Sequence, residues 1–159
     1  MNGRFRVLRS DIQAELDAIG RIFAALPAPG AELTDAAEAI VAGYYLHNLY
    51  NAFESIFRLV AEAFENHVPN TSHWHTLLLD RMGRDIEGIR PRLIGDVALE
   101  ALDELRRFRH IFRHLYRYDL KTEGVQKALA QAYRLKEVYL KDAGHFIAFL
   151  DRLDDGASE

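Results

Sequence analysis

The sequence predicts an all-α fold, an antiparallel helical bundle of four main helices and one short helix. Apolar residues recur every three or four positions along most of the chain, which is the period of an amphipathic helix. No run of alternating β-branched residues is present, and no Asn-Gly or Asp-Gly turn lies between two such runs, so strands are not expected. The 159 residues contain no repeat, linker or low-complexity block and are expected to form one domain, 1–159.

The first two predicted helices are separated by a turn rich in proline and glycine. Residues 10–26 keep the three-and-four spacing of apolar residues, and Ser10 is the expected N-cap. Residues 27–30, with two prolines and a glycine, end this helix. The second helix is expected over residues 34–65, and acidic residues in its first turn suit the helix dipole: Asp35 and Glu38.

The second half of the chain is expected to hold a short helix, an irregular segment and two long helices. A loop at residues 67–71 precedes Ser72, the expected cap of the short helix. Glycine and proline make the segment after that helix irregular. The expected bounds are 74–82 for the short helix, 84–95 for the irregular segment, 96–117 and 123–153 for the long helices, and 154–159 for a frayed tail.

Composition and hydropathy indicate a cytoplasmic protein. The absence of cysteine excludes disulfides and thiolate metal sites. No segment reaches the ~18 uninterrupted apolar residues of a membrane span, and residues 1–9 lack the apolar run of a signal peptide. The Asn70-Thr71-Ser72 sequon is therefore expected to have no consequence. The net charge of −4 argues against broad, nonspecific nucleic-acid binding but allows a focused site for an anionic substrate.

Positive charge is concentrated in residues 106–117. This segment holds no acidic residue, and it leaves the rest of the chain with a formal charge of −9. Arginine offers a planar donor fork suited to phosphate, and histidine can exchange a proton near neutral pH. Together these groups can cleave a phosphodiester without a metal. The cluster consists of Arg106, Arg107, Arg109, His110, Arg113, His114 and Arg117.

The helical wheel places the members of this cluster on different faces. At about 100° per residue, Arg109, Arg113 and Tyr116 share one edge of an apolar stripe. His114 lies about 140° from Arg109, so the two do not converge in a regular isolated helix. Either the helix loosens near His114, or a second copy of the chain supplies the complementary groups across a twofold axis. The apolar stripe is formed by Leu105, Phe108, Phe112 and Leu115.

The segment from Arg109 to His114 resembles the Arg-polar-x-x-x-His signature of HEPN-domain ribonucleases. Together with Tyr116 it matches the Arg-x4-His-x-Tyr motif of HepT-like toxins. Three longer segments, 46–54, 74–82 and 108–116, are also similar to patterns of HepT-like proteins. The resemblance covers roughly residues 10–150.

This resemblance implies a HEPN-like bundle that forms a homodimer and cleaves RNA in the dimer cleft without a metal or other cofactor. It also implies a minimal nucleotidyltransferase antitoxin that adds AMP to the motif tyrosine, here Tyr116. Arg109 and His114 are carried over as catalytic residues, and His110 and Arg113 as supporting residues. Which arginine faces the phosphate stays open, because Arg107-x6-His114 also fits a looser spacing.

The function expected from these residues is a toxin, an endoribonuclease that acts by transesterification. A base removes the proton of a 2′-hydroxyl, the oxygen attacks the adjacent phosphate, and the 5′-oxygen leaves with a proton. His114 is the expected acid or base, and Arg109 is expected to stabilise the transition-state charge. DNA should resist because it lacks the 2′-hydroxyl. Two alternatives are a non-catalytic HEPN scaffold for a nucleotidyltransferase and a plain helical interaction protein.

Other polar and aromatic residues have structural explanations. Glu54 is expected to form a surface ion pair with Arg58, four residues later. Two histidine pairs with metal-ligand spacing lack an evident third ligand, so no metal is expected at His110 and His114 or at His73 and His75. Aromatic residues of the second helix are expected in the core or a dimer interface rather than in a base-stacking platform: Tyr44, Tyr45, Tyr50, Phe53 and Phe57.

Overall fold

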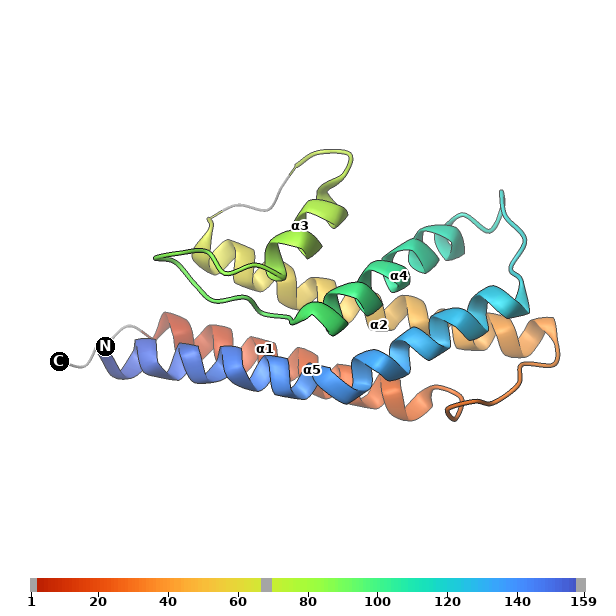
Figure 1. The fold of residues 1–159 in the computed structure, drawn as a ribbon, viewed down its shortest axis with the longest axis horizontal. Coiled ribbons are helices and arrows are strands. Elements are labelled where there is room, and N and C mark those ends of the chain that lie inside the picture. Colours follow the sequence, from red (N-terminus) through yellow and green to blue (C-terminus); the bar gives the residue numbers. More distant parts are fainter. Residues whose placement is uncertain (1–2, 67–69, 157–159) are drawn as a thin grey trace.

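The computed structural model describes residues 3–66 and 70–156, and in these residues the fold is all-α, as predicted (Figure 1). The only β-type pairing within them is an isolated bridge between Ile86 and Arg90. No helix in this described part is long and apolar enough to cross a membrane. The helices are α1 (Arg4–Ala25), α2 (Ala36–Phe64), α3 (Trp74–Met82), α4 (Asp96–Arg113) and α5 (Thr122–Gly156).

The four long helices form an up-and-down bundle in which helices adjacent along the chain run antiparallel, as do α1 and α5, while α2 and α5 pack on each other in the same direction (Figure 1). Helix α2 packs on α1 and α4, and α5 packs on α1 and α4 from the other side. The short helix α3 covers α2 and α4 near the start of α4. One continuous apolar core connects the helices, and its fully buried side chains include Ile12, Ile19, Leu46, Leu49, Phe57, Leu78, Leu102, Leu105 and Phe146.

Helix α1 begins at Arg4, so the prediction of Ser10 as its N-cap was wrong. The physical reason is that the apolar stripe extends towards the N-terminus: Leu8 is buried, and the ring of Phe5 stacks on Phe64 at 5.6 Å. Helix α2 begins close to its predicted start. Its N-cap is Asp35, whose carboxylate accepts a hydrogen bond from the Glu38 backbone N–H at 2.8 Å.

Helix α3 has its predicted bounds, but Ser72 does not cap it. The N-cap residue is His73, which makes no capping hydrogen bond through its side chain. Most of the loop predicted before it, residues 67–69, lies outside the described residues.

Helix α4 ends at Arg113 rather than at residue 117 as predicted. His114 is its C-cap, and a turn follows in which the backbone N–H groups of Arg117 and Tyr118 donate to the His114 carbonyl at 2.8 and 3.2 Å. The apolar stripe provides the reason. It is buried at Phe108 and only half-buried at Phe112, so one more turn of helix would bury little.

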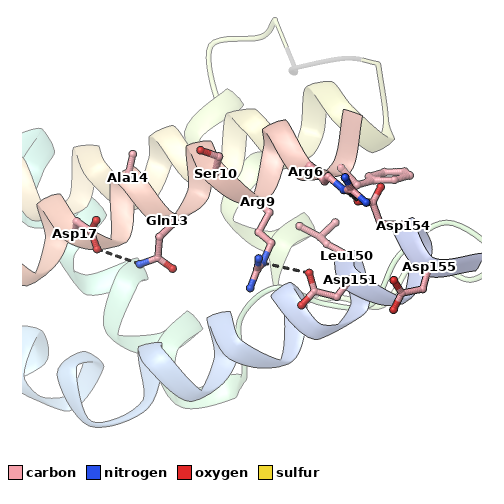
Figure 2. Close-up of a pocket in the computed structure, with 11 residues that line it drawn as sticks. Arg6, Arg9, Ser10, Gln13, Ala14, Asp17, Leu150, Asp151, Asp154 and Asp155 are labelled. Carbon is pink, nitrogen blue, oxygen red and sulfur yellow. Dashed lines mark hydrogen bonds and ion pairs between the residues drawn. The ribbon is translucent and has the colours of Figure 1, made fainter. Parts of the chain in front are cut away.

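Helix α5 continues to Gly156, beyond the predicted end at residue 153, and residues 157–159 of the predicted frayed tail lie outside the described residues. Ion pairs to α1 support this last turn. Figure 2 shows the groove between the two helices, where Arg9 pairs with Asp151 at 3.2 Å and Arg6 with Asp154 at 2.6 Å. The groove lies at the end of the bundle that holds both termini, whereas the basic cluster lies at the C-terminal end of α4 (Figure 1).

Candidate functional site

The close packing of α4 on α2 sets the position of the basic cluster. Phe108 is buried, and Phe112 packs over Gly43, so closely that a methyl group on Gly43 would lie 2.7 Å from the Phe112 ring. Glycine at this position therefore allows the two backbones to approach. Arg109 lies one turn of α4 before Phe112, and the close approach of the two helices brings it against the middle of α2.

Arg109 is half-buried between the two helices. Its Nε–H donates a hydrogen bond to the Asn51 side-chain oxygen at 2.6 Å, and its guanidinium carbon lies 5.9 Å from the centre of the Tyr50 ring. No other hydrogen bond of its guanidinium is found within residues 3–66 and 70–156. The terminal nitrogens are thus available to an anionic ligand while Nε holds the group in place.

Electrostatic effects on Arg109 oppose one another. Burial lowers its pKa, Glu54 raises it, and Arg113 lowers it again. An arginine remains protonated near neutral pH in proteins. The site therefore holds a partly desolvated positive charge, which attracts a phosphate more strongly than a fully solvated one does.

His47 lies one turn from Asn51 on α2 and is half-buried. Its Nδ1 is 3.3 Å from the Asn51 side-chain nitrogen and 3.4 Å from the Asn48 side-chain oxygen, and its ring centre is 5.6 Å from that of Phe112. Burial lowers the pKa of His47 below 6.5; the contact with Asn48 opposes this, while Arg109 and Arg113 on α4 lower the pKa further.

The lowered pKa of His47 predicts how the stability of the protein depends on pH. Between its folded-state pKa and 6.5, the unfolded chain binds more protons at this residue, so His47 makes folding less favourable as pH falls through 6.5. His47→Gln cannot titrate, and it is expected to reduce the loss of melting temperature between about pH 7.5 and pH 5.5. Thermal unfolding of both proteins at the two pH values measures this. An equal loss in both would contradict the assignment.

His114 lies beyond the last turn of α4, with its ring against His110. The ring centres are 4.5 Å apart, and His114 Nδ1 donates a hydrogen bond to the His110 carbonyl oxygen at 2.7 Å. A carbonyl oxygen only accepts, so Nδ1 carries a proton. In the neutral ring, Nε2 then has the free lone pair that a general base needs.

Tyr116 extends into solvent from the turn after α4. It is 77% exposed, its ring centre is 6.0 Å from that of His114, and the Arg117 guanidinium lies 5.5 Å from the ring. A core position for this aromatic is thereby excluded. Its side chain is therefore accessible from solvent.

The structure does not bring Arg109 and His114 together within one chain. Arg109 faces α2, whereas His114 faces His110 and Tyr116, and no contact between Arg109 and His114 occurs among the described residues. The expected loosening near His114 is present, because the helix ends at Arg113, but it does not turn the imidazole toward Arg109.

The other arginines of the cluster differ in their partners. Arg106 and Arg107 form ion pairs with acidic residues of the preceding turn, Asp103 and Glu104. Arg113 is exposed, and no ion pair involves it in the part of the chain that the structure describes. The cluster arginines without an ion pair in the described residues are therefore Arg109, Arg113 and Arg117, rather than Arg106 and Arg107.

The predicted ion pair between Glu54 and Arg58 is wrong. Glu54 is buried, only 6% exposed, and its carboxylate lies 2.7 Å from His75 Nδ1, while Arg58 stacks on Trp74 at 4.3 Å. The reason is that α3 packs over this face of α2. His75 then pairs with Glu54, and Trp74 stacks with Arg58, so Glu54 and Arg58 do not pair with each other. Sequence spacing alone contains no sign of this packing.

Three of the five α2 aromatics lie in the core, which is one of the two locations expected for them. Tyr50, Phe53 and Phe57 are buried in the core, while Tyr45 is half-buried and Tyr44 is 54% exposed. The Tyr50 hydroxyl is buried without a hydrogen-bond partner in the described residues. Burial raises the pKa of Tyr50, and Glu54 raises it further, so this hydroxyl stays protonated.

No group of three or more histidine, aspartate or glutamate side chains in the described part could hold a metal ion. His73 is the N-cap of α3, and His75 pairs with Glu54.

Sequence reasoning missed two polar residues of this site, His47 and Asn51. They lie four residues apart, on one face of a helix that is otherwise largely apolar. That spacing was the available signal, but without the position of α4 it does not point to Arg109.

Comparison with known families matches residues 41–150, which include both helices of the site, to the family described as HepT-like protein. No curated protein and no solved structure matches the chain.

Proposed function

Because the chain belongs to the HepT-like protein family, we propose that it is a metal-independent endoribonuclease toxin that acts as a homodimer. The observation that carries the proposal is the hydrogen bonding and orientation of the two motif side chains. Arg109 is fixed through Nε with its terminal nitrogens free, and His114 presents Nε2 as an acceptor, yet the two face different directions in one chain. Each is suited to its role, and a second subunit would complete the site.

The exposed surface of α2 supports pairing of two chains through this face. Ile40 and Tyr44 are 51% and 54% exposed, and with His47 and Asn51 they recur at three- and four-residue intervals along α2. Apolar side chains beside a half-buried polar site are typical of a surface that a partner covers. The proposal requires a twofold axis at this face that brings His114 of the partner subunit to Arg109.

The proposed reaction is transesterification of RNA. Nε2 of one His114 accepts the 2′-hydroxyl proton, O2′ forms a bond to phosphorus, and the bond from phosphorus to O5′ breaks. The imidazolium formed in this way then gives O5′ its proton, and Arg109 stabilises the charge on the pentacovalent phosphate. The products are a 2′,3′-cyclic phosphate and a free 5′-hydroxyl, and the 2′-hydroxyl requirement protects DNA.

Cleavage of RNA by the purified protein in EDTA tests this function. We expect products with 2′,3′-cyclic phosphate ends, no cleavage of DNA of the same sequence, and a dimer by light scattering. Binding of a nucleotidyltransferase without any cleavage of RNA would instead favour a non-catalytic partner of that enzyme. Failure to bind either RNA or a nucleotidyltransferase would favour a plain helical interaction protein.

For the antitoxin, we propose a minimal nucleotidyltransferase that adds AMP to Tyr116. The phenolic oxygen would attack the α-phosphorus of ATP, and pyrophosphate would leave. The exposed hydroxyl supports this, and the added phosphate would occupy the cations meant for RNA.

Intact mass after coexpression with such an enzyme tests the role of Tyr116. We expect a gain of one or more AMP units, with loss of toxicity, and neither change in Tyr116→Phe. Tyr118→Phe is the matched control, because Tyr118 is exposed in the same turn. Loss of toxicity without a gain in mass would show that neutralisation works by another route.

A further inference from the structure

A chain of hydrogen bonds connects Arg109 to His47 across the two helices. The Arg109 Nε–H donates to the Asn51 side-chain oxygen at 2.6 Å, and the Asn51 side-chain nitrogen lies 3.3 Å from His47 Nδ1. The chain thus runs from α4 to α2 and then one turn along α2. None of these contacts follows from the HepT-like motif itself, which lies entirely in α4 and the turn after it.

The direction of these hydrogen bonds is fixed at its Arg109 end. A guanidinium nitrogen can only donate, so the Asn51 oxygen must face Arg109, and the Asn51 NH₂ group must face His47. An NH₂ group donates, so His47 Nδ1 has to accept. In the neutral imidazole the proton then lies on Nε2.

The neighbouring asparagine does not oppose this arrangement. Asn48 has its side-chain oxygen 3.4 Å from His47 Nδ1, but no other hydrogen bond fixes the orientation of its amide among the described residues. The assignment of oxygen and nitrogen in such an amide can be reversed without moving the side chain. Asn51 has no such freedom, because Arg109 fixes it.

The surrounding charges disfavour a doubly protonated His47. The charged side chains that act on it are Arg109 and Arg113, both from α4, and burial acts in the same direction. The neutral form with a proton on Nε2 is therefore the form present near neutral pH.

The Nε2 atom of His47 is open to a ligand. In residues 3–66 and 70–156, the fully buried side-chain polar atoms without a partner are the Tyr50 hydroxyl and one Glu65 oxygen. His47 Nε2 has no hydrogen bond within this part of the chain and is not among them, so it reaches solvent. It lies in the same cationic surroundings as Arg109 and Arg113.

We propose that His47 is a further substrate-binding residue of this site, and that its Nε2–H donates a hydrogen bond to a phosphate oxygen of the bound RNA. The inference rests on the proposed function and names a residue outside its motif. It gives the two histidines opposite tautomers and separate tasks. His114 accepts through Nε2 and can move a proton, whereas His47 donates through Nε2 and holds the strand.

The first experiment measures binding of an RNA that cannot be cleaved because its riboses carry 2′-O-methyl groups. A hydrogen bond to a charged acceptor is worth about 1.5–3 kcal/mol, so we expect His47→Ala to weaken binding roughly 10- to 150-fold near pH 7.5. His47→Gln places an amide donor near the position of Nε2, and we expect it to bind within about threefold of the wild type. His145→Ala is the matched control, because His145 is exposed on α5.

The second experiment reverses one hydrogen bond. Asn51→Asp keeps an oxygen for Arg109 but presents an acceptor to His47, which moves the imidazole proton to Nδ1 and raises the pKa of His47. Nitrogen shifts of ¹⁵N-labelled histidine report the tautomer. We expect a proton on Nε2 in the wild type and on Nδ1 in Asn51→Asp. The added negative charge also weakens RNA binding, so its effect is measured separately in the His47→Ala background.

The possible outcomes separate the inference from the proposed function. If the wild type cleaves RNA but His47→Ala binds the methylated RNA as tightly as the His145→Ala control, the inference is wrong and the proposed function stands. A proton on Nδ1 of His47 in the wild type would also overturn the inference alone. If the wild type neither binds nor cleaves RNA, the proposed function is wrong and the inference falls with it.

Discussion

His114→Ala is expected to lower the rate of RNA cleavage by about 10²–10⁴-fold, which is the usual contribution of a positioned general acid or base. The imidazole is the group whose Nε2 is free to exchange a proton, because its Nδ1–H donates to the His110 carbonyl. Single-turnover cleavage of a labelled RNA measures the chemical step. Growth arrest on expression of the wild type, but not of His114→Ala, measures the same effect in cells.

Two features allow a loss of cleavage to be attributed to the missing His114 imidazole rather than to a loss of stability or to the removal of any histidine. His114 is the C-cap of α4, and its side chain is outside the apolar core, so its removal costs only the hydrogen bond to the His110 carbonyl and should lower the melting temperature by no more than about 2–4 °C. His145→Ala removes a histidine from the exposed surface of α5 and is expected to cleave RNA at the wild-type rate. Growth arrest that persists in His114→Ala would overturn the assigned role.

The helices were predictable because apolar residues recur along the chain at the positions that lie on the buried side of each helix. Of the predicted apolar stripe of α4, Leu105 and Phe108 are buried, whereas Phe112 and Leu115 near the end of the helix are only half-buried. The ends of helices were less predictable. Helix α1 begins at Arg4 and α4 ends at Arg113, where packing against other helices begins and stops. The periodicity within one segment does not contain that information.

The relative orientation of the candidate site residues was predictable in α4, whereas their contacts with α2 were not. The spacing of Arg109 and His114 already placed them on different faces of the helix, and the structure keeps them apart. The partner of Arg109, by contrast, is Asn51, 58 residues away in sequence. The predicted ion pair of Glu54 was wrong for the same reason. Its partner His75 comes from α3, and only the fold determines the position of that helix.

Arg109→Ala is expected to lower the rate of cleavage by about 10²–10³-fold, the usual cost of removing a donor aimed at transition-state charge. Arg109→Lys keeps the positive charge but lacks the Nε–H that Asn51 accepts, so we expect an intermediate rate. Single-turnover cleavage by the wild type, Arg109→Lys and Arg109→Ala measures the order of the three rates. Arg152→Ala is the control, because Arg152 is exposed on α5. A wild-type rate in Arg109→Ala would assign the phosphate to another arginine, with Arg113 the next candidate.

The two inactive variants together distinguish a site shared between subunits from a site within one chain. If Arg109 of one subunit works with His114 of the partner subunit, a mixed dimer of Arg109→Ala and His114→Ala holds one site that lacks both groups and one that is intact. Coexpression with two different tags and purification through both isolates mixed dimers, and we expect about half the wild-type rate. If both groups acted within one chain, each site would lack one of them and the mixed dimer would be as inactive as either parent. Recovery of activity from two inactive chains requires a site that neither chain forms alone, and this is the geometry that we propose from the different directions in which Arg109 and His114 face.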